Sequence, residues 1–304
     1  MAKKPTSAGS EKLLFNKLKQ FDEPGLFHDN YQTPDYIQAN LKDALRPYQH
    51  GALRYLHYTQ RKREEALLHY RHLLFHMATG AGKTMVMAGT ILYLFKEYGY
   101  QNFIFFVHTD AIIQKTRENL LNPQSPKYLF SQELEIDGEK ITIAPVETFP
   151  SVPERNTIYL KLSTIHKMHD ELNSYRENSI TYEDLKEIPL VLLGDEAHHF
   201  NAGTKARGKS KTSPENEEQT WERTIENILD LRPDNRLFEF TATIDLANKD
   251  IGQKYRDKVV YQYDLKQFMS DGYSKKVMLL EANQNDGDKM LDAVLLSPVS
   301  YTHL

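Results

Sequence analysis

The 304-residue chain contains no cysteine, which excludes a disulfide framework, a thiol nucleophile and a zinc site built on thiolates. It has no run of about 18 or more apolar residues, so no transmembrane helix is predicted. The basic residues 1–12 lead into no apolar stretch; we therefore expect no secretory signal, a cytoplasmic protein and no membrane partner. Neither charge sign dominates, with 38 Lys and Arg against 42 Asp and Glu, which excludes a polycation that coats nucleic acid but leaves room for a local basic groove.

What the sequence does contain, from Leu45 onward, is an alternation of short apolar runs with longer helical patterns. Such alternation is typical of βα units that build a mostly parallel, buried sheet, so we predict an α/β fold. The predicted strands cover residues 73–76, 103–108, 157–163, 190–194, 237–241 and 258–263. The predicted helices cover residues 11–21, 83–97, 110–120, 164–173, 216–230 and 264–270. Residues 133–136 and 140–143 are predicted to form a hairpin, because they flank the turn dipeptide Asp137-Gly138.

One of these strand-to-helix junctions has the sequence Met77-Ala-Thr-Gly-Ala-Gly-Lys-Thr84. A phosphate-binding loop requires this context, because its glycines let successive N–H groups turn inward and the following helix adds its positive end. We predict that the loop binds the phosphates of ATP through Thr79, Gly80, Ala81, Gly82, Lys83 and Thr84. Lys83 is expected to reach the β- and γ-phosphates, and the Thr84 hydroxyl to bind Mg²⁺. Met77 stands where the general motif has Gly, at a position without close ligand contact.

A second buried run, residues 189–194, ends in Asp195-Glu-Ala-His198. A carboxylate at the end of another strand forms the second half of a nucleotide site, so Asp195 is predicted to hold Mg²⁺ through its water shell. Glu196 is placed to orient and deprotonate the attacking water, the role that separates an NTPase from a nucleotide binder. His198 is the remaining catalytic candidate. The His-Glu-x-x-His spacing of zinc enzymes is absent here.

With these two motifs in this order and about 110 residues apart, the chain resembles the first RecA-like domain of a superfamily-two helicase or translocase. The segment Leu45-Arg-Pro-Tyr-Gln49 resembles the upstream element that reads the adenine edge, which makes Gln49 the candidate base contact. Its Arg-Pro pair is also typical of a helix start. Thr241-Ala-Thr243 resembles the element that couples hydrolysis to domain motion. The resemblance implies that Thr241 and Thr243 hydrogen-bond the Asp-Glu-Ala-His segment.

Residues 105–116, 195–199, 239–245 and 263–275 resemble more closely the restriction (Res) subunit of type III restriction–modification enzymes. The resemblance extends from about Tyr36 to about Leu280. It implies an ATP-dependent motor that moves along double-stranded DNA after a modification methyltransferase subunit has recognised a site. It also implies nucleic-acid contacts in the loops after the second and third sheet strands, where the candidates are Thr109, Lys115, Thr116 and Thr164. Thr164 and Asp110 are equally interpretable as N-caps of the helices that follow.

A motor of this class needs a second RecA-like domain, whose arginine at the γ-phosphate is typically worth about 10³ to 10⁵ in rate. We expect a lead-in over residues 1–44 and a RecA-like ATP-binding domain over residues 45–265. Residues 266–304 are expected to be the start of a truncated second domain or a non-native tail. The alternatives are a repair or remodelling helicase with the same front half, a nucleotide-binding module without turnover and, least consistent with the motifs, a phosphate-loop kinase.

Overall fold

The computed structural model describes residues 13–23, 25, 31–60, 70–107, 109–174, 180–196, 223–246 and 248–273. The chain divides into two compact units, residues 1–265 and 266–304. The division into a lead-in, a motor domain and a tail stays a prediction. Among the described residues, none of the helices combines the length and the apolar character that crossing a membrane requires.

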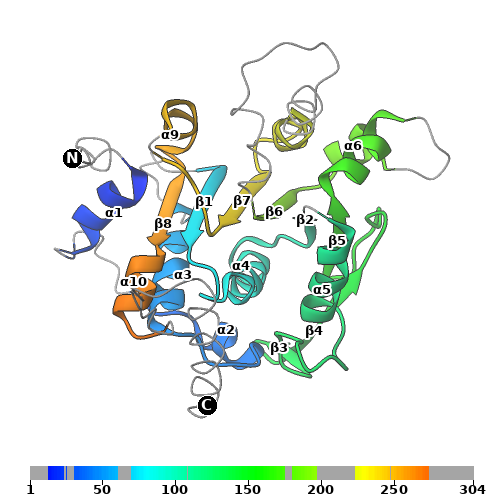
Figure 1. Ribbon diagram of the computed structural model, residues 1–304. Helices are drawn as coiled ribbons and strands as arrows, with labels where there is room; N and C mark the ends of the chain where they lie inside the picture. Colours follow the sequence, from blue (N-terminus) through cyan, green and yellow to red (C-terminus); the bar gives the residue numbers. More distant parts are fainter. Residues whose placement is uncertain are drawn as a thin grey trace, which may run out of the picture. The chain divides into compact units, whose positions relative to one another are not determined.

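The first unit contains an eight-stranded sheet within the described ranges (Figure 1). The strands are β1 (His72–Met77), β2 (Asn102–Val107), β3 (Leu134–Ile136), β4 (Glu139–Pro145), β5 (Thr157–Thr164), β6 (Leu190–Asp195), β7 (Arg236–Thr241) and β8 (Val259–Tyr263). Their order across the sheet is β3-β4-β5-β2-β6-β7-β1-β8, and every neighbouring pair is parallel except β3 with β4. The predicted α/β fold with a mostly parallel sheet is confirmed.

Helices cover both faces of this sheet. They are α1 (Leu14–Asp22), α2 (Asp35–Asn40), α3 (Pro47–Gln60), α4 (Lys83–Tyr98), α5 (Asp110–Leu120), α6 (Ile165–Asn173), α7 (Tyr182–Lys186) and α9 (Lys249–Tyr255), and residues 223–230 are helical as well. Figure 1 shows α4 and α5 on one side of the sheet and α6 and α9 on the other. The chain therefore runs from β1 through β2 to β5 over one face, and returns through β6 and β7 to β8 over the other.

The centre of the unit is buried on every side. All residues of β2 are buried, as are residues 85–94 of α4. Such burial is typical of a parallel sheet covered by helices on both faces, and of a helix that is apolar all round. Phe75 of β1 stacks on Phe240 of β7, with ring centroids 4.7 Å apart. The strand and the helix that flank the predicted phosphate loop are thus both anchored in the core.

The predicted hairpin is present as β3 and β4. Asp137 and Gly138 at its turn have φ values of 55° and 78°, and two positive φ angles are what a type I′ turn requires. The helix predicted for residues 216–230 is present over its described part, residues 223–230. Four helices were not predicted, namely α2, α3, α7 and α9. Helix α3 begins at Pro47, as the alternative interpretation of the Arg-Pro pair predicts.

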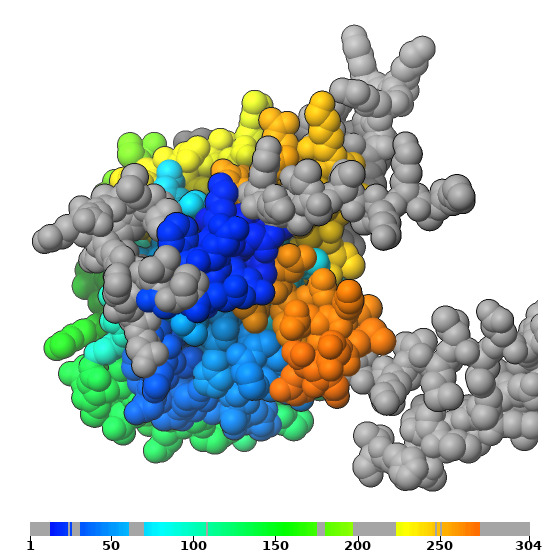
Figure 2. Space-filling model, turned by 90° about the vertical axis from the view of Figure 1, so that its left-hand side faces the viewer, coloured from blue at the N-terminus to red at the C-terminus, as the bar shows by residue number. Residues whose placement is uncertain are grey.

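The segments ahead of α3 pack onto the same unit. The Leu14 N–H donates to the Arg256 carbonyl at 2.9 Å, and the Phe15 ring lies 5.3 Å from that of Tyr55 in α3. Figure 2 shows α1, in dark blue, seated against the paler blue surface of α3. Further along, the Asn40 side chain donates to the Glu135 carbonyl at 2.7 Å and accepts the Glu135 N–H at 2.8 Å. Asn40 therefore covers the outer side of β3, the last strand of the sheet.

In the second unit, α10 (Leu265–Ser270) begins at the boundary and contributes residues 266–270. The Asp271 N–H donates to the Gln267 carbonyl at 2.9 Å and ends the helix. Phe268 and Tyr273 stack with ring centroids 6.0 Å apart, which folds the next residues back along α10. The described part of this unit is thus a short helix followed by residues that fold back onto it.

Candidate nucleotide site

The loop between β1 and α4, residues 78–82, turns through two glycines with positive φ. Gly80 has a φ of 82° and Gly82 a φ of 72°, both in the left-handed region that disfavours residues with a Cβ. A Cβ on Gly82 would also lie 2.5 Å from Gln49 Nε2. Met77, at the position that is Gly in the general motif, is the last residue of β1 and pairs with Tyr263. Its fully buried side chain therefore belongs to the core, and the turn begins one residue later.

Lys83 is the first residue of α4, and an acid from the end of β6 holds its amino group. Lys83 Nζ lies 3.1 Å from Glu196 Oε1, and the two side chains are 10% and 29% exposed. Only β7 separates β1 from β6, so the ends of these strands bring the loop and the acid together. Partial shielding from water strengthens this attraction relative to a surface ion pair. Two residues that the sequence places in separate motifs are thus in contact.

Glu196 also has an unusual backbone. Its φ is 57°, in the left-handed region. For a residue with a Cβ this conformation costs on the order of 1 kcal/mol or more, and such strain gathers at functional sites. The turn after β6 therefore holds the Glu196 carboxylate in a position that a relaxed extended chain would not give.

Asp195, the last residue of β6, carries a buried carboxyl group with an unused oxygen. Burial, and after it the neighbouring Glu196 carboxylate, raise the pKa of Asp195 to about 6, against the opposing effects of Lys83 and Lys115. Its Oδ1 is buried and has no hydrogen-bond partner in the described part of the chain. A bound cation, or water held by one, would satisfy this acceptor, so the residue fits a Mg²⁺ site.

The described residues contain no cluster of three or more His, Cys, Asp or Glu side chains that would hold a metal ion by itself. This composition suits Mg²⁺, which usually keeps several waters and takes one or two carboxylates together with substrate phosphates. Thr84, the second predicted ligand, follows Lys83 in the first turn of α4.

Gln49 lies in the first turn of α3 and joins this helix to the phosphate loop. Its Oε1 accepts the Arg46 N–H at 2.8 Å, and its Nε2 donates to the Ala81 carbonyl at 3.1 Å. The residue is only 5% exposed. An amide has a second lone pair and a second hydrogen for further contacts, so these bonds do not decide the expected contact with a base. They do give Gln49 a second role, in supporting the loop.

The Thr-Ala-Thr turn follows β7, the strand between β1 and β6. Thr241 is fully buried, and its hydroxyl donates to the Thr243 carbonyl at 2.9 Å and accepts the Thr243 N–H at 3.3 Å. Both candidate coupling residues therefore stabilise one tight turn. That turn lies beside the loop of β1 on one side and the acids of β6 on the other.

The four nucleic-acid candidates divide by exposure. Thr109 and Lys115 are exposed, whereas Thr116 and Thr164 are each 4% exposed. The Thr164 hydroxyl accepts the Lys167 N–H at 3.2 Å, so Thr164 is the N-cap of α6, as the alternative interpretation predicts. Hydroxyl groups inside the fold do not reach a DNA backbone, which removes Thr116 and Thr164 as direct contacts in this conformation.

At α5 the N-cap is Thr109, and Asp110 is the first helical residue. The N-cap interpretation of Asp110 is therefore wrong by one position, because Thr109 has the extended backbone that a cap requires. Asp110 Oδ1 instead lies 2.7 Å from Lys167 Nζ, which joins the first turns of α5 and α6. His198 lies outside the described residues.

Sequence reasoning gave no role to His76 of β1, although its Nε2 lies 3.2 Å from the Ala242 carbonyl of the Thr-Ala-Thr turn. The available signal was a polar side chain in the otherwise apolar strand 73–77.

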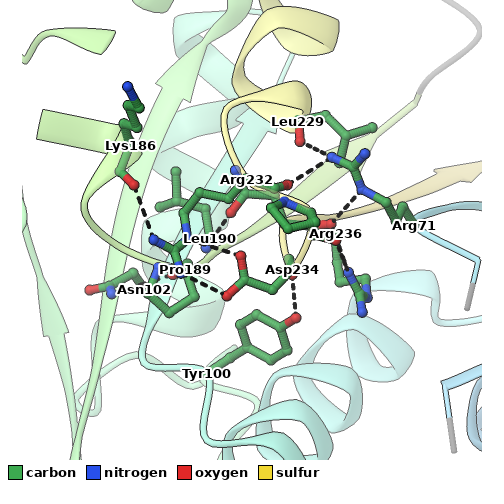
Figure 3. Close-up of polar contacts among 12 residues, drawn as sticks. Arg71, Tyr100, Asn102, Lys186, Pro189, Leu190, Leu229, Arg232, Asp234 and Arg236 are labelled. Atoms are coloured by element: carbon green, nitrogen blue, oxygen red, sulfur yellow. Dashed lines mark hydrogen bonds and ion pairs between the residues drawn. The ribbon is translucent and has the colours of Figure 1, made fainter. Parts of the chain in front are cut away.

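A second cluster of charged side chains lies where β1 and β7 begin (Figure 3). Arg232 donates to both carboxylate oxygens of Asp234, at 2.9 and 3.0 Å. Arg71 donates to the Arg232 carbonyl at 2.9 Å, Arg236 to the Pro233 carbonyl at 3.1 Å, and the Tyr100 hydroxyl to the Asp234 carbonyl. These guanidinium groups already donate hydrogen bonds to oxygen atoms of the protein itself. The cluster therefore stabilises the turn before β7 and is not an anion site.

A family model described as the res subunit of type III restriction enzymes matches residues 42–246. The chain is 35% identical over 289 residues to the probable type III restriction-modification enzyme HindVIP Res subunit of Haemophilus influenzae. That alignment covers 88% of this chain and 55% of the relative, so the chain spans about half the length of this curated relative.

Among solved structures, the chain is similar to the UvsW helicase of bacteriophage T4, with a TM-score of 0.43 and 12% identity over 83% of this chain and 78% of that one. It is also similar to the SWI2/SNF2 ATPase core of Sulfolobus solfataricus in complex with dsDNA. There the TM-score is 0.41 and the identity 14%, over 86% of this chain and 44% of that one. No functional argument is drawn from likenesses at this level.

Proposed function

The chain belongs to the family of type III restriction enzyme Res subunits, and on this premise we propose that it is the ATP-binding half of a DNA-dependent ATPase that moves along double-stranded DNA. The observation that carries the proposal is the contact between Lys83 of the phosphate loop and Glu196 of the acidic strand end. This contact unites a phosphate-binding cation with a general base at one edge of the sheet. A nucleotide binder without turnover has no need of the second group.

ATP is bound in this proposal by the loop of residues 78–82 and the start of α4. Left-handed glycines at positions 80 and 82 suit a chain that turns its N–H groups toward an anion, and the helix adds its positive end. Lys83 then leaves Glu196 and bonds the β- and γ-phosphates. Gln49, which already bonds the loop, is the candidate contact for the adenine edge.

The Thr84 hydroxyl and the Asp195 carboxylate would hold Mg²⁺, which neutralises phosphate charge when bound. Once Lys83 has moved to the phosphates, the Glu196 carboxylate orients a water molecule and accepts its proton at Oε1. The left-handed backbone of Glu196 supports this role, because it fixes the position of the base. His198 remains a candidate of unassigned role.

The polymer partner we propose is duplex DNA, held at the junction after β2 and along α5. Thr109 and Lys115 are exposed there, and hydroxyl and ammonium groups suit phosphate contacts that position a protein without reading sequence. We assign no direct contact to Thr116 and Thr164, whose hydroxyls are buried. Site recognition is assigned to a modification methyltransferase subunit, in keeping with the family.

The test is DNA-stimulated ATPase activity of the Res protein that carries this chain, assayed with its modification subunit. Lys83→Ala and Glu196→Gln are each expected to lower the rate by about 10² or more, since each removes a group that acts on the reacting phosphate or water. Lys96→Ala is the matched control, because Lys96 lies on the same helix and pairs with Asp137 at the surface. Undiminished turnover in both site variants would refute the proposal.

Two alternatives stay open within this test. A repair or remodelling helicase with the same front half would show the same ATPase but no dependence on a modification subunit. A nucleotide-binding module without turnover is the other alternative. Saturable ATP binding without hydrolysis on any DNA would establish it.

A further inference from the structure

His76 occupies a position of β1 where the strand pattern favours an apolar side chain. It follows Leu74 by one strand repeat, so both side chains project from the same face, and Leu74 is fully buried in the core there. An imidazole on such a face loses water and needs hydrogen-bond partners to compensate. Packing alone does not explain a histidine at this position.

The partner of His76 lies in the Thr-Ala-Thr turn. His76 is paired with Thr241 in the register of β1 with β7, and its Nε2 reaches the next residue, 3.2 Å from the Ala242 carbonyl oxygen. The turn is already closed by the bonds between Thr241 and Thr243. The bond to Ala242 therefore ties a closed turn to the strand that leads into the phosphate loop.

The proton positions follow from the partners. Burial and, to a lesser extent, the Lys83 charge lower the pKa of His76, against the opposing effects of the Ala242 carbonyl and the Asp264 carboxylate, which favours the neutral ring. A carbonyl only accepts, so Nε2 carries the proton and Nδ1 is a bare acceptor. Nδ1 is buried without a hydrogen-bond partner in the described residues, and an unsatisfied buried acceptor is destabilising. A leucine would avoid this cost.

We propose that His76 is a positioning residue that transmits the state of the phosphate loop to the Thr-Ala-Thr turn through its hydrogen bond to the Ala242 carbonyl. Two residues after His76 the chain enters the loop, so a shift of the loop on nucleotide binding moves the ring and, through it, the turn. This inference rests on the proposed function, because it requires nucleotide at the loop. It adds a route through β1 to the contacts with the Asp-Glu-Ala-His segment that the resemblance implies for Thr241 and Thr243.

The test compares variants of the full chain with and without ADP and Mg²⁺. His76→Leu keeps an apolar side chain on the buried face but has no donor for Ala242, and His76→Gln restores a donor at a similar distance. His72→Gln is the matched control, because His72 lies on the same strand and face and bonds β7 through Glu239, at 2.6 Å, away from the loop. ADP affinity is measured by calorimetry, and hydrogen–deuterium exchange is followed in residues 238–246.

In the wild type and in His72→Gln, ADP is expected to change exchange in residues 241–246. In His76→Leu, the affinity is expected to stay within about twofold, because the ring is not a ligand of the nucleotide, while the change in exchange is lost. His76→Gln should recover it. An unaltered response in His76→Leu, or no response at these residues in a wild type that binds ADP, would overturn the inference. A wild type that binds no ADP would instead overturn the proposed function.

A second measurement needs no nucleotide. Two-bond ¹H–¹⁵N correlation of the imidazole is expected to report the tautomer with the proton on Nε2, since only that form donates to a carbonyl. A ring protonated on Nδ1 alone would rule out the bond to Ala242, and with it the proposed transmission.

Equal thermal stability of His76→Leu and the wild type, or a higher stability of the variant, would support a role of His76 beyond stabilising the fold.

Discussion

Lys83 has one anionic partner in this structure and would have another in the proposed function. In this structure its ammonium group neutralises Glu196 at 3.1 Å. In the proposed function the same group must bond phosphate oxygens, and Glu196 must be free to accept a proton. Nucleotide binding is therefore an exchange of one anionic partner for another, and the free energy of the ion pair is subtracted from the affinity for nucleotide.

The exchange predicts that Glu196→Gln binds ATP more tightly than the wild type while its hydrolysis is lost. The expected gain is roughly 2- to 10-fold, since a partly shielded charged pair is worth about 0.5 to 1.5 kcal/mol. Binding of a fluorescent ATP analogue to the purified chain measures it. Glu183→Gln, an exposed acid of α7, serves as the control for the loss of one negative charge. Equal or weaker binding by Glu196→Gln would contradict the exchange.

The raised pKa of Asp195 predicts that the free energy of unfolding depends on pH. Its folded-state pKa of about 6 lies above the ordinary value of 3.8, so protonation favours the folded state. That contribution is fully present below about pH 3.8 and is lost as the pH rises through about 6. At pH 7.5 the buried carboxylate therefore destabilises the nucleotide-free chain, and Asp195→Asn is expected to raise the free energy of unfolding by about 1 to 3 kcal/mol.

The measurement is denaturant unfolding of the wild type and Asp195→Asn at pH 7.5 and at pH 4.5, without nucleotide. The difference should be clearly smaller at pH 4.5, because the folded-state carboxyl is then mostly neutral, and should vanish only below about pH 3.8, where the unfolded chain is protonated as well. Asp230→Asn, an exposed carboxyl 74% open to solvent, should show no such trend. A constant difference at both pH values would indicate a cause other than ionisation.

At this scale the sequence predicted the residues of the loop and of the strand end, because each motif is contiguous in the chain. It did not predict what Gln49 and His76 contact. Those partners, Ala81 and Ala242, are brought close only by the packing of α3 and by the pairing of β1 with β7. A spacing along the chain carries no information about either.

At the level of elements, α3 and the phosphate loop fit each other closely at one point. Gly82 has a φ of 72°, and a Cβ there would lie 2.5 Å from Gln49 Nε2. Gly99, at the other end of α4, has a nearly equal φ of 74° but no atom within 4 Å of such a Cβ. Substitutions at these two glycines therefore distinguish the cost of a left-handed backbone, which both share, from the cost of a steric clash, which only Gly82 has.

Gly99→Ala is expected to destabilise the chain by roughly 1 to 2 kcal/mol, the backbone cost alone. Gly82→Ala should cost about 1 to 3 kcal/mol more, because the Gln49 amide must move and loses its bond to the loop. Denaturant unfolding measures both variants. Adding Gln49→Ala should recover part of the difference at Gly82 and none at Gly99, as a double-mutant cycle reports. Equal losses at the two glycines would show that α3 does not press on the loop.

Strands and helices were predicted correctly where apolar runs are strong. They were missed where aromatic and amide side chains are buried, or where the helix is short. The strands and α4 are rich in Leu, Ile, Val and Phe, so their pattern is visible. Helix α3 buries Tyr48, Gln49, Tyr55, Tyr58 and Gln60, and its aromatic and amide side chains hide the apolar stripe. Helices α2, α7 and α9 have seven residues or fewer, too short for a helical period to emerge.

Across the whole first unit, the position of the site follows from the order of the strands. The connection after β1 leads toward β2 over one face, and the connection after β7 leads toward β8 over the other. Both connections leave from the carboxyl ends of these neighbouring strands and pass over opposite faces of the sheet, and ligands of open α/β sheets bind outside the carboxyl ends of the strands. The sequence predicted parallel strands but not their order, because order depends on which strands pair across long distances in the chain.

Asn40 provides a test at the same scale, because it joins the N-terminal segment to the far edge of the sheet. It is 2% exposed and bonds both main-chain groups of Glu135 as well as the Tyr36 carbonyl. Asn40→Ala removes these three hydrogen bonds and is expected to cost about 2 to 3 kcal/mol of unfolding free energy, since each bond is worth about 0.5 to 1.5 kcal/mol. Exchange of the Glu135 amide should rise. Asn122→Ala, which removes an exposed amide bonded to Glu118, should stay within about 0.5 kcal/mol of the wild type.

The same contact decides how the sheet meets other molecules. Alternate residues of an antiparallel strand direct their N–H and C=O groups to opposite sides, so Glu135 is the residue of the three-residue strand β3 that faces outward. An open edge of this kind is a template on which a second chain adds a strand, the first step of edge-to-edge aggregation. With both groups of Glu135 taken by the Asn40 amide, the sheet ends at β3, and copies of the chain find no template there on which to polymerise.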